Sequence, residues 1–460
     1  MKLQYSSLSG INGPLLILDG VVNVSYDEVC DIELADSSQR TGRVIAIEGD
    51  RVILQVFEGT SGLSKEDVSV SFTGHPVELA LSKDMLGRAF SGSGKVCDGL
   101  DKICPDEKRD INGLPINPVS RTYPKSCIYT GISAIDGMST LIRGQKLPIF
   151  SGAGMSHNEL AAQIVRQAKV AGDAVGNFGI VFAGMGLKRD IVDFFYSNFE
   201  QSGALQRVVM FLNEASDPII ERILTPRCAL TCAEYLAFKH GMHILVIMTD
   251  MSSYCEAIRE FSSSKGEIPS RKGFPSYLYS DLASLYERAG IINGRSGSVT
   301  QVPILTMPND DITHPIPDLT GYITEGQIVL NRMMDQKGMY PPISILPSLS
   351  RLMKDGIGDG FTREDHPALA TQLFSCYSRV QDARSLASVI GEDELSSIDK
   401  MYMQFGRRFE EEFLRQRSSE DRSIERTLEI GWNLLSDLPK SELSRISSIL
   451  LDKYYIEKDA

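Results

Sequence analysis

The sequence contains no cysteine pair at C-x-x-C spacing, because its eight cysteines are scattered along 460 residues. This scatter argues against a zinc knuckle or a redox motif, so no metal site is predicted. It favours reduced thiols and a reducing compartment.

Long apolar runs are also missing. A membrane helix needs ~18–20 consecutive apolar residues, whereas the longest runs here, Pro14–Leu18 and Ile244–Met248, have the length of strands. The N-terminal residues lack the apolar region of a signal peptide. We therefore expect a soluble chain with no direct membrane span, so any membrane role would have to come through its partners.

Basic residues are in the minority, since 47 Lys and Arg stand against 60 Asp and Glu and the formal net charge is −13. Nucleic-acid binding requires clustered cations, so this balance predicts no nucleic-acid partner. The hydrophobic fraction of 42% and the charged fraction of 23% are those of an ordinary globular protein. The length allows about three domains.

The order of apolar runs divides the chain into three parts. Residues 1–76 carry short alternating runs and a hairpin signal at Glu48–Asp50, which predict a small barrel or sandwich. Residues 77–366 begin with a mainly connecting segment, 77–125, rich in Gly, Asp and Pro. Apolar strands then alternate with helical stretches, a pattern that predicts a parallel sheet covered on both faces. Residues 367–460 lose the strand signals and predict a helical domain.

The most informative motif is a Gly-rich turn, Ser151–Asn158, between a strand predicted at Lys146–Phe150 and a helix predicted at Glu159–Val170. A strand, a Gly-rich turn and a helix in this order point backbone N–H groups at a phosphate. Gly152 and Gly154 keep that character, so we identify them as candidate nucleotide-binding residues.

The side chains of a working P-loop are absent from this turn. The pattern G-x-x-x-x-G-K-[ST] is substituted at all four defining positions, 151, 156, 157 and 158. His157 is mostly neutral at pH 7 and cannot replace the lysine, and Asn158 is a poor substitute for a hydroxyl that binds Mg²⁺. We expect a vestigial site that hydrolyses nucleotide poorly. Weak nucleotide binding through the backbone stays an open alternative.

A further candidate residue is the acid Asp250, which follows the apolar strand His243–Met248. Its position resembles that of an acid that holds magnesium through water, but a helix-capping role is equally compatible with the sequence. The turn after the strand Gly179–Phe182 contains no carboxylate that could polarise an attacking water.

Several long stretches together make the chain resemble the non-catalytic B subunit of V-type and archaeal A-type rotary ATPases, essentially from end to end. These stretches are Phe57–Leu63 (FEGTSGL), Thr130–Asp136 (TGISAID), Arg143–Phe150 (RGQKLPIF), His243–Asp250 (HILVIMTD), Leu285–Gly290 (LYERAG), Thr313–Gln327 (THPIPDLTGYITEGQ) and Leu346–Leu352 (LPSLSRL).

The resemblance implies an N-terminal β-barrel, a central RecA-like domain of the P-loop NTPase fold and a C-terminal helical bundle. It implies a hexameric ring in which three such chains alternate with three catalytic A subunits, served by central rotor stalk and peripheral stalk subunits at the cytoplasmic face of the cell membrane. ATP or ADP would lie at the interface with a catalytic A subunit, with no cofactor tightly bound to this chain itself.

Two sets of site residues follow from the resemblance. Arg351 matches an arginine that reaches in trans to the phosphates bound by the neighbouring catalytic A subunit. A fixed guanidinium there can stabilise charge on the transferring phosphoryl group. Arg271, Lys272, Gly273 and Pro275 fall in a loop that is expected to face the rotor.

Two other functions stay open from the residues themselves: a stand-alone RecA-like NTPase, and a pseudo-ATPase scaffold unrelated to rotation. The altered turn disfavours the first, because an autonomous ATPase needs the lysine and the hydroxyl. The sequence does not distinguish H⁺ from Na⁺ transport, or synthesis from hydrolysis.

Overall fold

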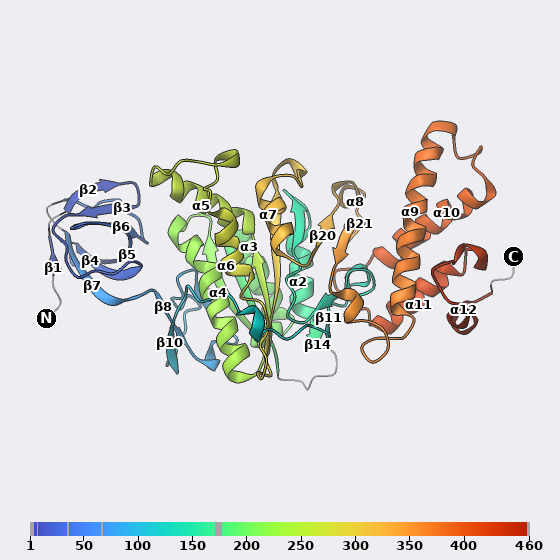
Figure 1. Ribbon diagram of the computed structural model, residues 1–460, viewed down its shortest axis with the longest axis horizontal. Coiled ribbons are helices and arrows are strands. Elements are labelled where there is room, and N and C mark those ends of the chain that lie inside the picture. Colours follow the sequence, from blue (N-terminus) through green and yellow to red (C-terminus); the bar gives the residue numbers. More distant parts are fainter. Residues whose placement is uncertain (1–3, 7, 35, 66–67, 171–176, 458–460) are drawn as a thin grey trace.

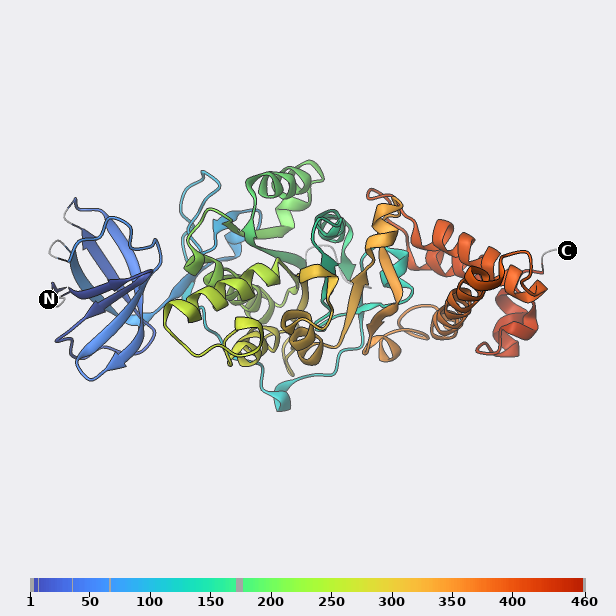
Figure 2. The ribbon, with the colours of Figure 1, turned by 90° about the horizontal axis from the view of Figure 1, so that it is seen from above.

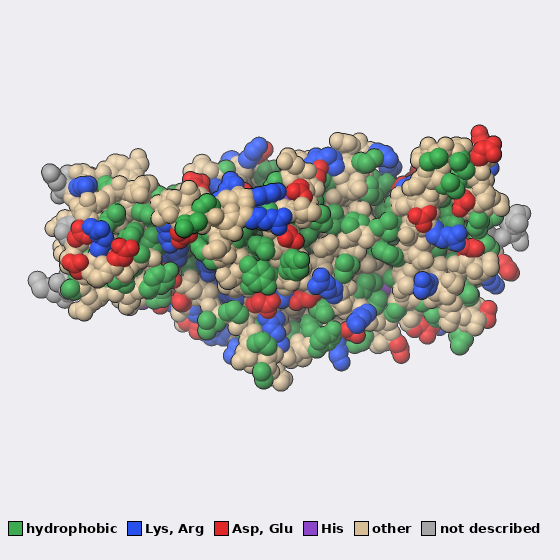
Figure 3. Space-filling model, turned by 45° about the horizontal axis from the view of Figure 1, so that its top comes forward, with side chains coloured by type: hydrophobic (Ala, Val, Ile, Leu, Met, Phe, Trp, Pro, Cys, Tyr) green, Lys and Arg blue, Asp and Glu red, His purple; other side chains and the backbone are tan. Residues whose placement is uncertain are grey.

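The computed structural model describes residues 4–6, 8–34, 36–65, 68–170 and 177–457. Figures 1 and 2 show a β-barrel at the N-terminal end, an α/β domain in the middle and helices at the C-terminal end. Basic and acidic side chains are interspersed over the face seen in Figure 3. Across the described ranges, no helix is both long and apolar enough to cross a bilayer.

Seven antiparallel strands form the barrel, in the order β1-β7-β4-β5-β6-β3-β2. Leu16 and Leu18 of β3 point into the same core as Leu54 and Val56 of β6, because alternate residues of a strand face one side. The hairpin predicted around Gly49 is confirmed by the pairing of β5 with β6. The strands are β1 (Gln4–Tyr5), β2 (Leu8–Asn12), β3 (Leu15–Leu18), β4 (Glu28–Leu34), β5 (Gln39–Glu48), β6 (Arg51–Val56) and β7 (Val68–Pro76).

The segment 77–125 contains more regular structure than its composition predicts. Strands β8 (Glu78–Leu81) and β10 (Glu107–Asp110) pair with each other, and β9 (Ala89–Ser91) forms the edge of the central sheet beside β16. Strands of three or four residues are too short to show an apolar period, so pairing partners far along the chain decide their conformation.

The central sheet has the order β21-β20-β13-β19-β17-β15-β16-β9, and β18 pairs with β19. Its inner strands are parallel, and β21 runs antiparallel to β20. Its remaining strands are β13 (Ile149–Gly152), β15 (Phe178–Leu187), β16 (Val208–Glu214), β17 (His243–Thr249), β18 (Gly290–Ile291), β19 (Ser298–Met307), β20 (Gly326–Leu330) and β21 (Ile343–Ser350). A small separate sheet contains β11 (Cys127–Tyr129), β12 (Leu141–Ile142) and β14 (Lys169–Val170).

Helices cover both faces of this sheet, as the unbroken apolar strands predict. In β15, Ile180 and Phe182 pack in one core with α2 and α3, whereas Val181 and Ala183 pack in another with α4 and α5. The helices of this domain are α1 (Ser133–Asp136), α2 (His157–Gln167), α3 (Arg189–Gln201), α4 (Ile219–His240), α5 (Met251–Ser264), α6 (Leu278–Tyr286), α7 (Pro315–Ile323) and α8 (Arg332–Gln336).

Several predicted elements of the central domain have other bounds in the structure. The helix predicted at Glu159–Val170 begins at His157 and ends at Gln167. The strand predicted at Lys146–Phe150 begins three residues later, at Ile149. The sequence predicts a helix at Ala229–His240 after a separate stretch, Pro218–Leu224, but the two form one helix, α4, which continues through Pro226. Proline costs a helix one hydrogen bond, but the residues of this helix are buried against the sheet, so packing outweighs the local preference.

The C-terminal domain consists of helices α9 (His366–Ile390), α10 (Ser397–Arg408), α11 (Ile424–Leu435) and α12 (Ser448–Tyr454). The sequence also predicts a helix at Phe409–Arg417, but the structure has a π-helical turn there, Phe409–Leu414, that directly continues α10. The only tryptophan, Trp432, donates its indole N–H to Asp365 at 2.5 Å and so ties α11 to the start of α9.

Candidate functional site

The Gly-rich turn lies between β13 and α2, at the carboxyl end of a parallel strand where α/β sheets bind their ligands. Gly154 has a left-handed backbone, with φ of 76°. At Gly152 a Cβ would overlap the ends of the Asp310 and Arg332 side chains, so any larger residue there would displace this pair. The strand, turn and helix predicted from the sequence are therefore present, and both glycines have a steric reason.

Two backbone N–H groups of the turn are used within the turn itself. Met155 donates its N–H to the carbonyl of Gly152 at 3.2 Å, and His157 donates its N–H to the carbonyl of Met155 at 2.9 Å. A phosphate cradle needs such groups to point at the ligand. The bonded pair is thus unavailable to a phosphate in this conformation.

An ion pair from two other elements covers the turn. Arg332, the first residue of α8, donates to Asp310 at 2.8 Å and to the carbonyl of Ala153 at 3.1 Å. Asp335, on the same helix, accepts the hydroxyl of Ser156 at 2.7 Å. The carboxylate of Asp310 therefore occupies space beside Gly152, and the guanidinium of Arg332 is already engaged.

These covering residues do not follow from the motif analysis of the sequence, because they come after other strands. Asp310 comes just after β19, the neighbour of β13, and its φ of 55° is left-handed. Such strained positions concentrate at functional sites. An acid shortly after an apolar strand, the signal that singled out Asp250, would also have found Asp310.

His157 begins α2, and its Nδ1 lies 3.0 Å from the hydroxyl of Ser151. Burial lowers the pKa of His157, although the charges of Asp250 and Glu159 act in the opposite direction. The neutral imidazole is therefore favoured at pH 7, and it provides no positive charge for a phosphate.

Asn158 and Asp250 also lie at this end of the sheet. The side-chain oxygen of Asn158 is buried and has no hydrogen-bond partner among the described residues. Asp250 caps α5, accepting the backbone N–H of Ser252 at 2.8 Å and that of Thr306 at 3.1 Å. The geometry thus shows the helix cap, and the magnesium role of Asp250 stays a prediction.

Arg351 is not brought to the Gly-rich turn. It follows the last residue of β21, the outermost strand, and is separated from β13 by β20. Its side chain is exposed and donates a long hydrogen bond of 3.4 Å to the carbonyl of Thr324. Within the described ranges it forms no ion pair, so the guanidinium can reach a neighbouring molecule.

The loop between α5 and α6, at the top of the central domain in Figure 1, carries Arg271, Lys272, Gly273 and Pro275. Arg271 donates to the carbonyl of Thr313 at 3.0 Å. Lys272 pairs with Asp311 at 3.3 Å, and both side chains are partly exposed. The loop is thus anchored to the segment after β19 and presents its charges at the surface.

The chain matches family models over most of its length. Residues 8–74 match the ATP synthase alpha/beta family beta-barrel domain, and residues 131–350 match the nucleotide-binding domain of the same family. Residues 355–455 match the C-terminal domain of V and A type ATP synthase. The fold and its Gly-rich turn therefore define the class: a nucleotide-binding-fold subunit of an ATP synthase.

Comparison with similar proteins identifies the family within this class. A V-type ATP synthase beta chain from Halothermothrix orenii is 62% identical over 452 residues, covering 98% of this chain and 97% of that protein. One from Thermotoga neapolitana is 58% identical over 456 residues and 99% of both chains. The solved ATP synthase subunit NeqB from Nanoarcheaum equitans has a TM-score of 0.74 at 39% identity and covers 93% of this chain and 100% of that one. The chain belongs to the family of V-type ATP synthase beta chains, and the predicted three-part fold class is confirmed.

Proposed function

We propose that the chain is the non-catalytic, regulatory B subunit of a V-type or A-type rotary ATP synthase. Three copies alternate with three catalytic A subunits in a hexameric ring that couples ATP synthesis or hydrolysis to ion transport. The observation that carries this proposal is the state of its own Gly-rich turn, which lacks the P-loop lysine and is covered by Asp310 and Arg332. In this proposal the chain has no working site of its own and contributes to the chemistry at the site of a neighbour.

Arg351 is the residue proposed to make that contribution. It is exposed at the end of the edge strand β21 and forms no ion pair among the described residues. A guanidinium that enters the site of a catalytic A subunit can hydrogen-bond the γ-phosphoryl oxygens and stabilise the charge that they carry in the transition state. ATP or ADP would be held at this interface by the catalytic neighbour, and this chain would hold no nucleotide tightly.

The loop of Arg271, Lys272, Gly273 and Pro275 is proposed to face the central rotor stalk. Its support is the position of the loop at one end of the central domain and the partial exposure of its charged side chains. Peripheral stalk subunits would hold the ring still. The complex as a whole would place this chain at the cytoplasmic face of the cell membrane.

Substitution of Arg351 by alanine, in a ring reconstituted with catalytic A subunits, tests the proposal. We expect the ring to assemble, as judged by its elution volume, and ATP hydrolysis to fall by ~10³-fold or more. Arg351→Lys should restore little activity, because an ammonium lacks the planar fork of a guanidinium.

Arg51→Ala is the matched control. Arg51 lies on the barrel, is about half exposed and pairs with Asp19 at 2.8 Å, so its loss should leave hydrolysis unchanged. A ring that contains Arg351→Ala and hydrolyses ATP at the wild-type rate would contradict the proposed role.

A further inference from the structure

A polar cavity of about 340 Å³ lies between the barrel and the central domain, away from the Gly-rich turn. Side chains from both domains line it, and those used below are Asp27, Arg43, Arg227, Lys265, Glu267 and Asp281. Interfaces between domains are a common place for small-molecule sites. A ligand held here would contact two domains at once.

Three cations from three elements converge on the polar cavity. Arg43 comes from β5, Arg227 from α4, and Lys265 is the residue that ends α5. Their side chains are only 12%, 14% and 21% exposed. Cations so far removed from water need matching negative charge and hydrogen-bond acceptors.

Three carboxylates also line the polar cavity, and two of them, Asp27 and Asp281, are bonded on both oxygens, whereas Glu267 accepts from Ser262 at 2.6 Å and pairs with Lys265 through its other oxygen. Asp27 accepts from Arg43 at 3.3 Å and from Asn112 at 2.6 Å. Asp281 accepts from Arg227 at 2.7 Å and from Tyr254 at 2.5 Å. Each of these two acids therefore bonds one cation and one neutral donor, and neither of them hydrogen-bonds Lys265.

Hydrogen-bond donors remain in excess. A guanidinium carries five N–H donors, yet Arg227 uses one of its nitrogens on Asp281, and Arg43 bonds only Asp27 and, at 2.8 Å, Gln55 among the described residues. The Lys265 ammonium lies 3.8 Å from Glu267, which is beyond hydrogen-bond distance. These residues line a space that is large enough for a small ligand rich in acceptor oxygens.

The electrostatics agree with this geometry. Burial lowers the pKa of Arg43, and the charge of Arg227 lowers it further, although Asp27 acts in the opposite direction. Burial also lowers the pKa of Lys265, and Arg43 adds to that effect against Glu267. Burial also acts to lower the pKa of Arg227, but Tyr254 and Asp281 outweigh it and the pKa is raised. Repulsion therefore acts between Arg43 and each of the other two cations, and an anion beside Arg43 would relieve it.

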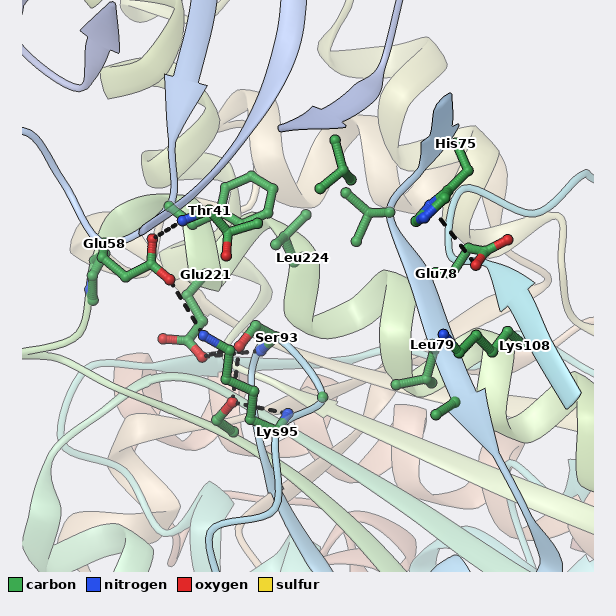
Figure 4. Close-up of a pocket in the computed structure, with 17 residues that line it drawn as sticks. Thr41, Glu58, His75, Glu78, Leu79, Ser93, Lys95, Lys108, Glu221 and Leu224 are labelled. Atoms are coloured by element: carbon green, nitrogen blue, oxygen red, sulfur yellow. Dashed lines mark hydrogen bonds and ion pairs between the residues drawn. The ribbon is translucent and has the colours of Figure 1, made fainter. Parts of the chain in front are cut away.

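A neighbouring cavity of about 560 Å³, between the same two domains, offers a contrast. Figure 4 shows Lys95 and Lys108 on opposite sides of it, with apolar walls that include Leu79 and Leu224. Lys95 already pairs with Glu58 at 3.3 Å. Of these two cavities, only the polar one brings several cations together.

We propose that the polar cavity binds a small multivalent oxyanion of the phosphate class, held by Arg43, Arg227 and Lys265, and that the bound anion fastens the barrel to the central domain. Free phosphate, pyrophosphate and the phosphate groups of a nucleotide share this chemistry. The proposal does not depend on Arg351 or on the ring, because it concerns the isolated chain.

Calorimetric titration of the full chain with sodium phosphate, pyrophosphate or ADP, at constant ionic strength, tests the proposal. We expect saturable binding of at least one of them, none with chloride, and a rise in the melting temperature that follows ligand concentration. Strength in the order pyrophosphate, phosphate, ADP would identify a free oxyanion, and ADP in first place would identify a nucleotide.

Two variants with opposite expected effects make the test specific. Lys265→Gln removes one cation and should weaken binding about tenfold, since a charge-assisted hydrogen bond is lost. Asp27→Asn removes a competing negative charge and should tighten binding. Asparagine also tolerates the left-handed φ of 68° at this position.

Lys95→Gln, on the neighbouring cavity, is the control and should bind the anion like the wild type. Absence of saturable binding at millimolar anion would overturn the proposal, as would equal weakening by Lys265→Gln and Lys95→Gln. If Lys265→Gln fails to fold, Asp27→Asn decides: tighter binding supports the site and unchanged or weaker binding refutes it.

Discussion

At the scale of single residues, His366 shows how burial sets a charge state. It begins α9, where the central domain meets the C-terminal helices. Its Nε2 lies 3.1 Å from the carbonyl of Gly137, and its Nδ1 lies 3.1 Å from the hydroxyl of Thr362. A neutral ring satisfies both partners by donating to the carbonyl and accepting from the hydroxyl. Burial lowers the pKa of His366 from 6.5 to about 4.

This shift predicts a loss of stability in mild acid. The unfolded chain takes up a proton at His366 as the pH falls below 6.5, whereas the folded chain resists until about pH 4. The free energy of unfolding should therefore decrease over this window, by at most about 1.4 kcal/mol per pH unit from this group, and should gain nothing from it above pH 6.5.

Urea unfolding of the wild type and His366→Gln at several pH values between 7 and 4.5 measures this effect. The difference between the two proteins should change with pH over the window, because glutamine does not titrate but can still donate to Gly137. His75→Gln, an exposed histidine of the barrel, is the control. Parallel pH profiles for the wild type and His366→Gln would contradict the assignment.

At the scale of elements, α4 and β19 approach each other so closely that only glycine fits at residue 297. A Cβ on Gly297 would overlap the carbonyl oxygen of Ala237, near the end of α4. By contrast, the space around Gly321 in α7 is open, with its nearest neighbour, the Gln327 side chain, at 3.7 Å. Packing therefore requires glycine at position 297 and leaves room for a Cβ at position 321.

Alanine at these two positions should have opposite effects. Gly297→Ala forces α4 and β19 apart and should destabilise the protein by about 1–3 kcal/mol. Gly321→Ala reduces the freedom of the unfolded chain and should stabilise α7 by up to about 1 kcal/mol. Denaturant unfolding of both variants measures the two free energies. An unchanged midpoint for Gly297→Ala would show that the close approach is easily relaxed.

The Gly-rich turn shows which parts of the candidate site can be predicted from residues that are neighbours in the sequence. Its flanking strand and helix were predictable, because the spacing of apolar residues within about a dozen positions indicates the type of element. The pair of Asp310 and Arg332 that covers it was not, since Arg332 lies 179 positions from Ala153 along the chain. Both covering residues meet the turn only when β19 and β20 pair with β13.

At the scale of the whole molecule, the proposed function depends on a neighbouring catalytic subunit. The isolated chain should hydrolyse ATP at a negligible rate, because its turn lacks the lysine and the hydroxyl and is covered by Asp310. A phosphate-release assay on the purified chain, beside the same chain in a ring with catalytic A subunits, measures this difference. Turnover by the isolated chain at about 1 s⁻¹ or more, abolished by His157→Ala, would favour a stand-alone NTPase.

The order of the three parts could be deduced from the sequence, because strand and helix periods are local properties and the family motifs run through the chain. The boundaries predicted at 76/77 and 366/367, and the roles of Arg351 and the loop of Arg271, Lys272, Gly273 and Pro275, stay predictions.

By itself, the sequence determined the class of fold, the alteration of the P-loop and the absence of long apolar runs, since each of these depends on residues that are close together along the chain. Only the tertiary structure decided what lies over the altered turn, that Asp250 caps a helix, and that Arg43, Arg227 and Lys265 share one cavity. The physical reason is that electrostatics and packing act through space. Charges on strands and helices far apart in the chain interact only after the sheet has assembled and the barrel has packed against it.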